Sequence, residues 1–170
     1  LYLGALVLFA LHVLVLYRLL RPAHPAAALF GAATALLGFI TMAASSLLHI
    51  STAPLSDLYE AADAGELAAI EAAWVGAQSV FDTMLATGVL LVPIGLLLLG
   101  FAMRRFPAIA SSIMWLTIGL GAVGTVGAVI AIIDPGSMFS ALSVLGIVVV
   151  MLATGWQMLR VRAGMRHLAD

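Results

Sequence analysis

The chain has 170 residues, of which 64% are hydrophobic and only 9% are charged, and its formal net charge is −1. A soluble domain has about a quarter of its residues charged, so this composition excludes a soluble fold and predicts an integral membrane protein in contact with the lipid bilayer. There is no excess of basic residues for binding nucleic acid. The lack of cysteine and lysine excludes disulfides, zinc–thiolate sites, iron–sulfur clusters and Schiff-base chemistry.

Five apolar runs are each long enough to cross the hydrocarbon core as a helix, which requires roughly 20 residues. None shows the alternation of barrel strands, so the expected fold class is all-α, a single transmembrane domain over residues 1–170. The expected helices cover residues 1–20, 26–50, 74–103, 108–133 and 138–159. Because Leu1 already lies inside an apolar run, we expect that one upstream helix is missing.

Charged residues separate onto two sides if these helices alternate in direction. One side carries every basic residue other than histidine: Arg18, Arg21, Arg104, Arg105, Arg160, Arg162 and Arg166. The other side carries Asp57, Glu60, Asp63, Glu66, Glu71 and Asp134. Arginine in short loops marks the cytoplasmic face. The sequence therefore predicts a protein of the bacterial plasma membrane with the visible N-terminus outside and the C-terminus in the cytoplasm.

The longest loop, residues 51–73, has apolar residues at intervals of three and four with acids between them, a pattern typical of an amphipathic helix. We expect a short amphipathic helix on the outer surface over about residues 54–73, interrupted at residues 63–65. Its second part would continue into the next transmembrane helix. The simpler interpretation is a surface helix with solvated acids, and the functional one is a lid or a rim that attracts cations.

Asp82 is the polar residue most suggestive of function, because it lies about eight residues inside the third expected helix, roughly 12 Å from its outer end. A carboxylate in the hydrocarbon region is costly and needs a partner or water. Gln78 lies one turn away, and the second expected helix carries Thr41, Ser45 and His49 one turn apart. We therefore expect these two helices to face each other, with the five residues forming a pocket for a small molecule or an ion. The alternative is that Asp82 only forms a hydrogen bond between the helices.

No catalytic residue, metal site or cofactor is predicted. His12 and His49 are expected at depths roughly 15 Å or more apart, which disfavours a haem with two histidine ligands. Ser45, His49 and Asp82 could be drawn as a hydrolytic triad, although only Ser45 and His49 have a spacing that permits contact. We interpret His12 instead as a hydrogen-bonded residue within the bundle.

Two further features lie within apolar helices. Residues 119–124 match the dinucleotide fingerprint GxGxxG, but that motif has meaning only between a strand and a helix. Small residues on one face indicate close helix packing instead, and the face consists of Thr117, Gly121, Gly124 and Ala128. Pro93 is interpreted as a simple bend rather than as part of a gate.

Several short segments together resemble an uncharacterised bacterial multi-pass membrane family, domain of unknown function 4386. Residues 16–22, LYRLLRP, are similar to that family's LY-x-LL-(K/R)-P junction, and the later segments are Leu58-Tyr59, Phe81-Asp82, Leu99-Gly100-Phe101 and Phe106-Pro107. The resemblance implies the same topology with a further helix upstream. The family has no established activity, so the resemblance implies no catalytic residues.

The leading functional expectation is a small membrane protein that binds another molecule or serves as a helix partner, with no enzymatic activity. One alternative is a small transporter or channel subunit that uses an outward-facing pocket around Asp82 and assembles as a homo-oligomer. A second alternative is an intramembrane enzyme that uses the same cluster.

Overall fold

The computed structural model describes residues 2–63, 65–134 and 137–166, and every regular element in these ranges is a helix. The helices are α1 (Tyr2–Leu20), α2 (Pro25–Ser51), α3 (Ala53–Ala61), α4 (Leu67–Met103), α5 (Ser111–Ile133) and α6 (Phe139–Arg166). Five helical segments are long and apolar enough to cross a membrane: Tyr2–Leu20, Pro25–Ala61, Leu67–Met103, Ser111–Ile133 and Ala141–Arg160. The predicted all-α fold with five helices able to span a membrane is therefore confirmed.

The outside of the bundle is apolar. Leu8, Phe30 and Leu152 are each more than 60% exposed, and many other large apolar side chains point outward. Such a surface is unfavourable in water but not in hydrocarbon. The exposed surface thus fits a multi-pass membrane protein.

The segment expected as an outer amphipathic helix, residues 54–73, is interrupted near residues 63–65 as predicted, and its two parts belong to α3 and to the beginning of α4. The chain leaves helical geometry at Ala62, whose φ of −73° and ψ of 145° are extended values. Asp63 Oδ1 then accepts hydrogen bonds from the backbone N–H groups of Gly65 at 2.9 Å and Glu66 at 3.2 Å, which helps to turn the chain. As a result α4 begins at Leu67 rather than at residue 74.

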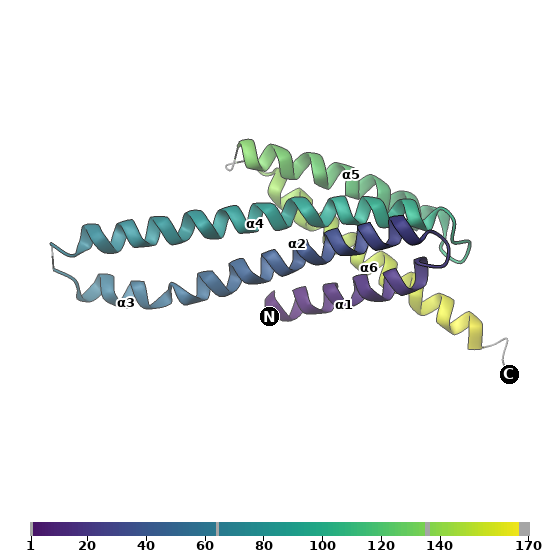
Figure 1. Cartoon of the computed structure of the whole chain (residues 1–170), viewed down its shortest axis with the longest axis horizontal. Coiled ribbons are helices and arrows are strands. Elements are labelled where there is room, and N and C mark those ends of the chain that lie inside the picture. The colour runs from purple at the N-terminus through teal and green to yellow at the C-terminus, as the bar shows by residue number, and fades with distance from the viewer. Residues whose placement is uncertain (1, 64, 135–136, 167–170) are drawn as a thin grey trace.

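The helices differ greatly in length. α4 has 37 residues and is about 55 Å long at 1.5 Å per residue, whereas α5 has 23 residues and is about 35 Å long. α3 and the beginning of α4 therefore continue past the ends of α1, α5 and α6 as an antiparallel pair (Figure 1). We call α3, residues 67–81 of α4 and the residues that join them the hairpin tip.

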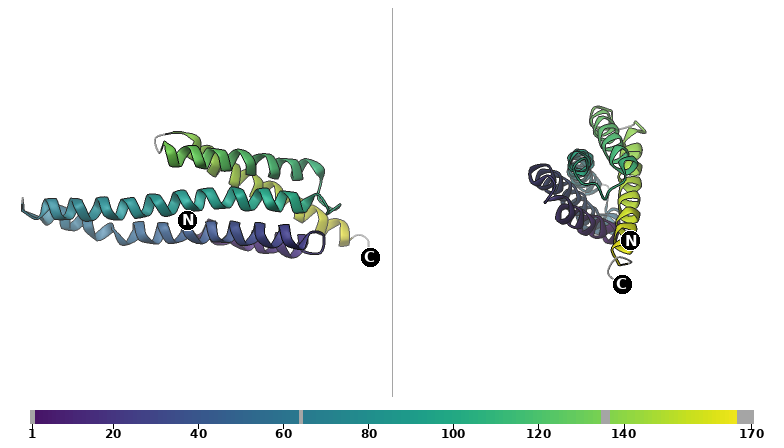
Figure 2. Two further views of the ribbon diagram at one scale, coloured as in Figure 1. Left: turned by 45° about the horizontal axis from the view of Figure 1, so that its top comes forward. Right: turned by 90° about the vertical axis from the view of Figure 1, so that its right-hand side faces the viewer.

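α4 is the central helix and contacts each of the other five helices, most extensively α2 and then α5. α1 packs against α2 on one side, and α6 packs against α5 on the other (Figure 2). α1 and α6 also touch each other. The core is therefore arranged around the half of α4 that follows the tip, where Val92, Leu96 and Leu99 are almost completely buried.

Glycines bring the backbones of α2 and α4 close together. A Cβ atom at Gly95 would lie 2.5 Å from Ala35 N and 2.6 Å from Gly31 O, and one at Gly38 would lie 2.9 Å from Val92 N. A Cβ atom at Gly88 would lie 2.8 Å from Gly38 O. Only glycine fits at these positions, so this crossing is built on small residues as in other membrane helix pairs.

The predicted small-residue face of α5 is confirmed, since Thr117, Gly121, Gly124 and Ala128 are buried. Gly124 lies against Pro93 of α4, where a Cβ atom would be 3.0 Å from the proline Cβ. α4 continues through Pro93 as one helix. Two glycines of the GxGxxG match, Gly121 and Gly124, thus serve helix packing, whereas the third, Gly119, faces open space.

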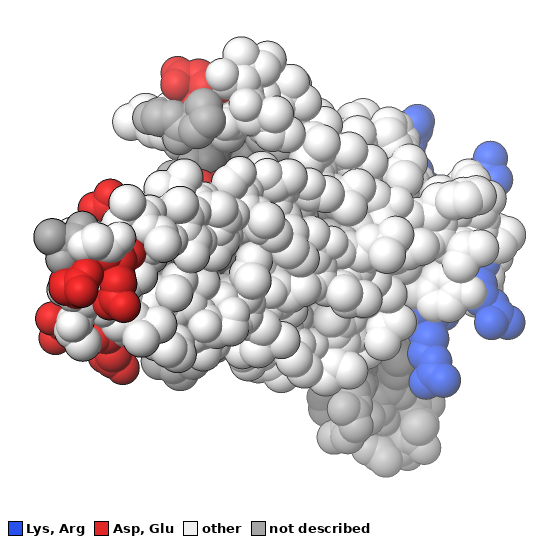
Figure 3. Space-filling model, turned by 60° about the vertical axis from the view of Figure 1, so that its left-hand side comes forward, with Lys and Arg blue, Asp and Glu red and all other residues white. Residues whose placement is uncertain are grey.

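The charged side chains lie at opposite ends of the molecule (Figure 3). We call one the arginine end, where α1 ends just after Arg18 and α4 ends just before Arg104. The other is the acidic end, which contains the hairpin tip and Asp134 at the end of α5. The separation of charge read from the sequence is therefore present in space.

Candidate functional site

The two helices expected to form the pocket do pack against each other as α2 and α4. On α2, Ser45 is fully buried and donates a hydrogen bond from Oγ to Met42 O at 2.8 Å. Thr41 donates from Oγ1 to Leu37 O, also at 2.8 Å. Both hydroxyl groups are bonded to carbonyls of their own helix, and neither bonds to α4.

His49 lies on the side of the α2–α4 pair that faces the start of α1. Its ring packs on Phe81 of α4, with the ring centroids 5.0 Å apart. A hollow of about 510 Å³ opens beside the first turn of α1. It is lined by His49 and by Tyr2, Leu3, Ser46, Ile50, Phe81 and Leu85.

Gln78 and Asp82 lie on a different surface of α4. Gln78 Nε2 donates a hydrogen bond to Asp82 Oδ1 at 2.9 Å, and this pair is exposed. The two side chains line a hollow of about 440 Å³ with Trp74, Val75, Ser79 and Thr83. The structure therefore brings Gln78 and Asp82 together, while His49 lies over a separate hollow. Ser45 and Thr41 are bonded within α2.

The depth expected for Asp82 needs correction. Asp82 lines a hollow of about 290 Å³ with Ala131 and Ile132, which belong to the last turn of α5. Its carboxylate is therefore level with the end of the bundle rather than roughly 12 Å inside it. The cause is that α4 begins at Leu67 and its first turns extend beyond the other helices, whereas the estimate from sequence counted depth from Trp74.

The triad drawn from the sequence is not assembled. Ser45 is bonded to a backbone carbonyl, His49 packs on Phe81, and Asp82 accepts its hydrogen bond from Gln78. Within the described residues, histidine and acidic side chains do not gather into any group of three that could hold a metal ion.

His12 forms a contact between helices that the sequence did not identify. Its Nε2 lies 2.8 Å from Thr154 Oγ1, so that the side chain joins α1 to α6. Thr154 Oγ1 also lies 2.7 Å from Val150 O of its own helix. Gly155 makes room for the ring, since a Cβ atom there would lie 3.4 Å from His12 Cε1. The prediction that His12 is hydrogen-bonded in the bundle is confirmed.

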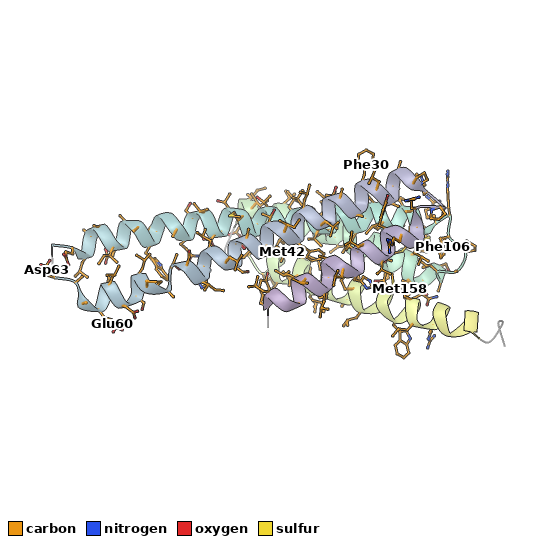
Figure 4. The ribbon with its side chains drawn as sticks, turned by 60° about the horizontal axis from the view of Figure 1, so that its bottom comes forward. Phe30, Met42, Glu60, Asp63, Phe106 and Met158 are labelled. Carbon is orange, nitrogen blue, oxygen red and sulfur yellow. The ribbon has the colours of Figure 1, made fainter. Side chains whose placement is uncertain are left out.

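The hairpin tip contains a further hollow, of about 390 Å³, between α3 and the first turns of α4. We call it the tip hollow, and its lining residues are Leu55, Ser56, Tyr59, Ile70, Glu71, Trp74 and Val75. The acids Glu60 and Asp63 lie close by at the same end (Figure 4). The signal in the sequence was the repeat of apolar residues on both sides of residues 63–65, which indicates two helices folded against each other.

Comparison with known proteins gave no match: neither a family model, nor a curated protein, nor a solved structure is significantly similar to this chain.

Proposed function

We propose that this chain is a multi-pass protein of the bacterial plasma membrane that functions by binding, with the hairpin tip as its binding arm. The observation that carries the proposal is the length of the tip, because residues 67–81 of α4 extend about 22 Å past the bundle. Packing of the bundle alone does not require this extension. Deletion of the hairpin tip should therefore leave the bundle folded. Because the tip is the proposed binding arm, the same deletion should abolish binding.

The buried polar side chains favour binding at the tip over chemistry inside the bundle. Ser45, Thr117 and Thr154 donate to carbonyls of their own helices, and Ser143 donates to Gly124 O of α5 at 2.9 Å. These hydroxyl groups are therefore satisfied by backbone carbonyls, and among the buried side-chain atoms of the described residues only Ser137 Oγ lacks a hydrogen-bond partner. Among the hollows described, the tip hollow is the one formed entirely by residues of the hairpin tip.

The proposed orientation follows from the arginines. With the arginine end in the cytoplasm, the tip and the visible N-terminus lie outside and the C-terminus lies inside. α3 is then an extracytoplasmic amphipathic helix, with Leu55 and Tyr59 toward α4 and acids toward water. The resemblance to domain of unknown function 4386 agrees with this topology, and we propose that the chain is a distant member of that family.

The absence of cysteine from the chain permits a direct test of orientation. Ser56→Cys places a thiol at the tip, and Ser111→Cys places one at the arginine end of α5. A membrane-impermeant maleimide should label Ser56→Cys in intact cells and label Ser111→Cys only after lysis. The opposite result would show that the tip lies in the cytoplasm.

Binding by the tip is tested with a photoreactive amino acid incorporated in living cells. Leu58 in the tip is 55% exposed, and Leu152 on the apolar side of α6 is 68% exposed and serves as the control. The probe at position 58 should form a discrete adduct with another protein, and the probe at position 152 should not. Equal adducts at both positions, or none at position 58, would refute the proposal.

One observation favours the transporter or channel alternative, namely that the Asp82 carboxylate lies over the hollow between α4 and α5. The chain reconstituted in liposomes separates the two functions. Under the binding proposal, proton and alkali-cation flux equals that of empty liposomes. A flux that Asp82→Asn abolishes and Asp134→Asn retains would establish transport.

A further inference from the structure

The tip hollow is an apolar cavity with no helix of the described chain above it. Tyr59 is 48% exposed, Trp74 is 41% exposed and Val75 is 66% exposed, although all three line it. Among the described helices, α3 contacts only α2 and α4, and none of its nine residues is buried. Exposed aromatic and aliphatic side chains gathered around a hollow are typical of surfaces that bind another protein.

The charges around the hollow all have one sign. Glu71 lines it, and the rest of the tip carries Asp57, Glu60, Asp63 and Glu66. The sequence has no arginine, lysine or histidine from Ile50 to Met103, so no cation of this hairpin neutralises these acids. The field at the tip is therefore negative and attracts cationic partners.

The negative charge at the tip favours some possible ligands of the tip hollow over others. A second copy of the chain would bring the same acids to the same place, and like charges repel. Anionic lipid headgroups would be repelled as well. A segment with positive charges beside apolar side chains is complementary in both respects.

We propose that the tip hollow binds a segment of another protein in which apolar anchor side chains are flanked by lysine or arginine. The anchors enter the space of about 390 Å³ against Tyr59 and Trp74, and the cations lie beside the acids. A volume of this size is within the usual range for a binding pocket. This inference rests on the proposed function, since it names the chemistry of the partner that the arm binds.

Trp74 provides the readout, because it lines the hollow and the chain has only three tryptophans. Trp115 and Trp156 are 59% and 60% exposed, so both can be replaced by phenylalanine with little loss of packing. The full chain with Trp115→Phe and Trp156→Phe is placed in phosphatidylcholine nanodiscs, which carry no net charge. A synthetic helical peptide of leucine and lysine should shift the Trp74 emission to shorter wavelength, with saturation.

Two control peptides isolate the two parts of the inference. A leucine–glutamate peptide retains the apolar anchors and reverses the charge, and a glutamine–lysine peptide retains the charge without the anchors. Neither should saturate the Trp74 signal at the concentrations at which the leucine–lysine peptide does. Equal binding of the leucine–glutamate peptide would refute the role of charge, and equal binding of the glutamine–lysine peptide would refute the role of the hollow.

Substitutions in the hollow should weaken binding in a defined order. Tyr59→Ser should lower the affinity by about ten-fold or more, as expected for a central aromatic contact. Glu71→Gln should lower it by about two- to five-fold, with a smaller effect in high salt, because exposed ion pairs are weak and screened. Asp134→Asn is the matched control, since it removes an acid from the same end outside the hollow, and it should leave the affinity unchanged. Equal affinities of all three variants would refute the inference.

Other occupants give different results. Quenching of Trp74 by brominated lipid before peptide is added would show that the bilayer occupies the hollow. Efficient disulfide formation between Ser56→Cys chains would show that a second copy does. A protein adduct at Leu58 without any peptide binding would refute only the partner chemistry, whereas no adduct at Leu58 would refute the proposed function itself.

Discussion

The α2–α4 pair within the bundle and its continuation as the hairpin tip are parts of one antiparallel hairpin, but they pack differently. In the bundle, Gly31, Gly38, Gly88 and Gly95 let the two backbones approach until no Cβ atom would fit. In the tip, α3 and α4 are separated by larger side chains that leave the tip hollow between them. Gly76, in the tip segment of α4, has no atom within 4 Å of its Cβ position.

Because of this difference, one part of the hairpin contributes to the stability of the fold and the other part is the proposed binding surface. Packing of the glycine crossing is complete, so it stabilises the fold and offers no surface to a ligand. Packing of the tip is incomplete, so it contributes little to the fold and leaves exposed the apolar surface at which we propose that a partner binds. Substitutions in the two regions should therefore affect different properties.

The largest effect is expected from Gly95→Leu, which tests the crossing. A Cβ atom there would lie 2.5 Å from Ala35 N, so the backbones must separate and the free energy of unfolding should fall by about 3 kcal/mol. Denaturation in detergent micelles, followed by circular dichroism, measures this loss. Gly76→Leu is the control in the same helix and should leave stability nearly unchanged; equal losses in both variants would show that the crossing is not specially tight.

A smaller effect is expected from Thr154→Val, which removes the hydrogen-bond partner of His12 between α1 and α6. Hydrogen bonds between membrane helices contribute on average about 0.6 kcal/mol, with a maximum of about 1.7 kcal/mol. The same denaturation experiment should show a loss in this range. Thr125→Val is the matched control, because Thr125 Oγ1 donates only to Gly121 O of its own helix. If Thr125→Val lowered the free energy of unfolding as much as Thr154→Val does, the hydrogen bond between His12 and Thr154 would not contribute to stability beyond the loss of any threonine hydroxyl.

The smallest effect on stability is expected from Tyr59→Ser in the tip. Its side chain is nearly half exposed, so the free energy of unfolding should change by no more than about 0.5 kcal/mol. The same substitution should strongly weaken peptide binding, which makes it the sharpest contrast with Gly95→Leu. A large loss of stability would mean that the tip and the bundle form one folding unit.

Much of the fold is present in the pattern of apolar residues. Each helix that could cross a membrane contains an apolar run of about the length that the bilayer requires. The small-residue face of α5 followed from the spacing of Thr117, Gly121, Gly124 and Ala128. These features are local and repeat with the helical period. They can therefore be predicted without knowing which helices are neighbours.

The pairing of α2 with α4 was expected for a different reason from the one observed. Polar residues suggested it, whereas glycines at the crossing form it. The seven-residue spacing of Gly31 and Gly38, repeated in Gly88 and Gly95, places each pair on one helix face and was the better signal.

Other features of the site depend on relative depth, which hydropathy does not provide. Apolar residues such as Val75 and Val80 continue in α4 beyond the bundle, so counting from Trp74 placed Asp82 too deep. The partner of His12 could have been found by counting from the arginine end instead. His12 precedes Arg18 by the same number of residues as Thr154 precedes Arg160, and α1 and α6 run in the same direction.

The unequal lengths of the helices also determine how this protein matches a bilayer. α5 has 23 residues and is about 35 Å long, so it spans a hydrocarbon core of ordinary thickness with little excess. α2 and α4 are long enough for any bilayer, and their apolar surface continues past the end of α5. In a thicker membrane, hydrophobic mismatch would therefore arise at α5 before it arises at α2 or α4, and the bilayer would thin locally around α5.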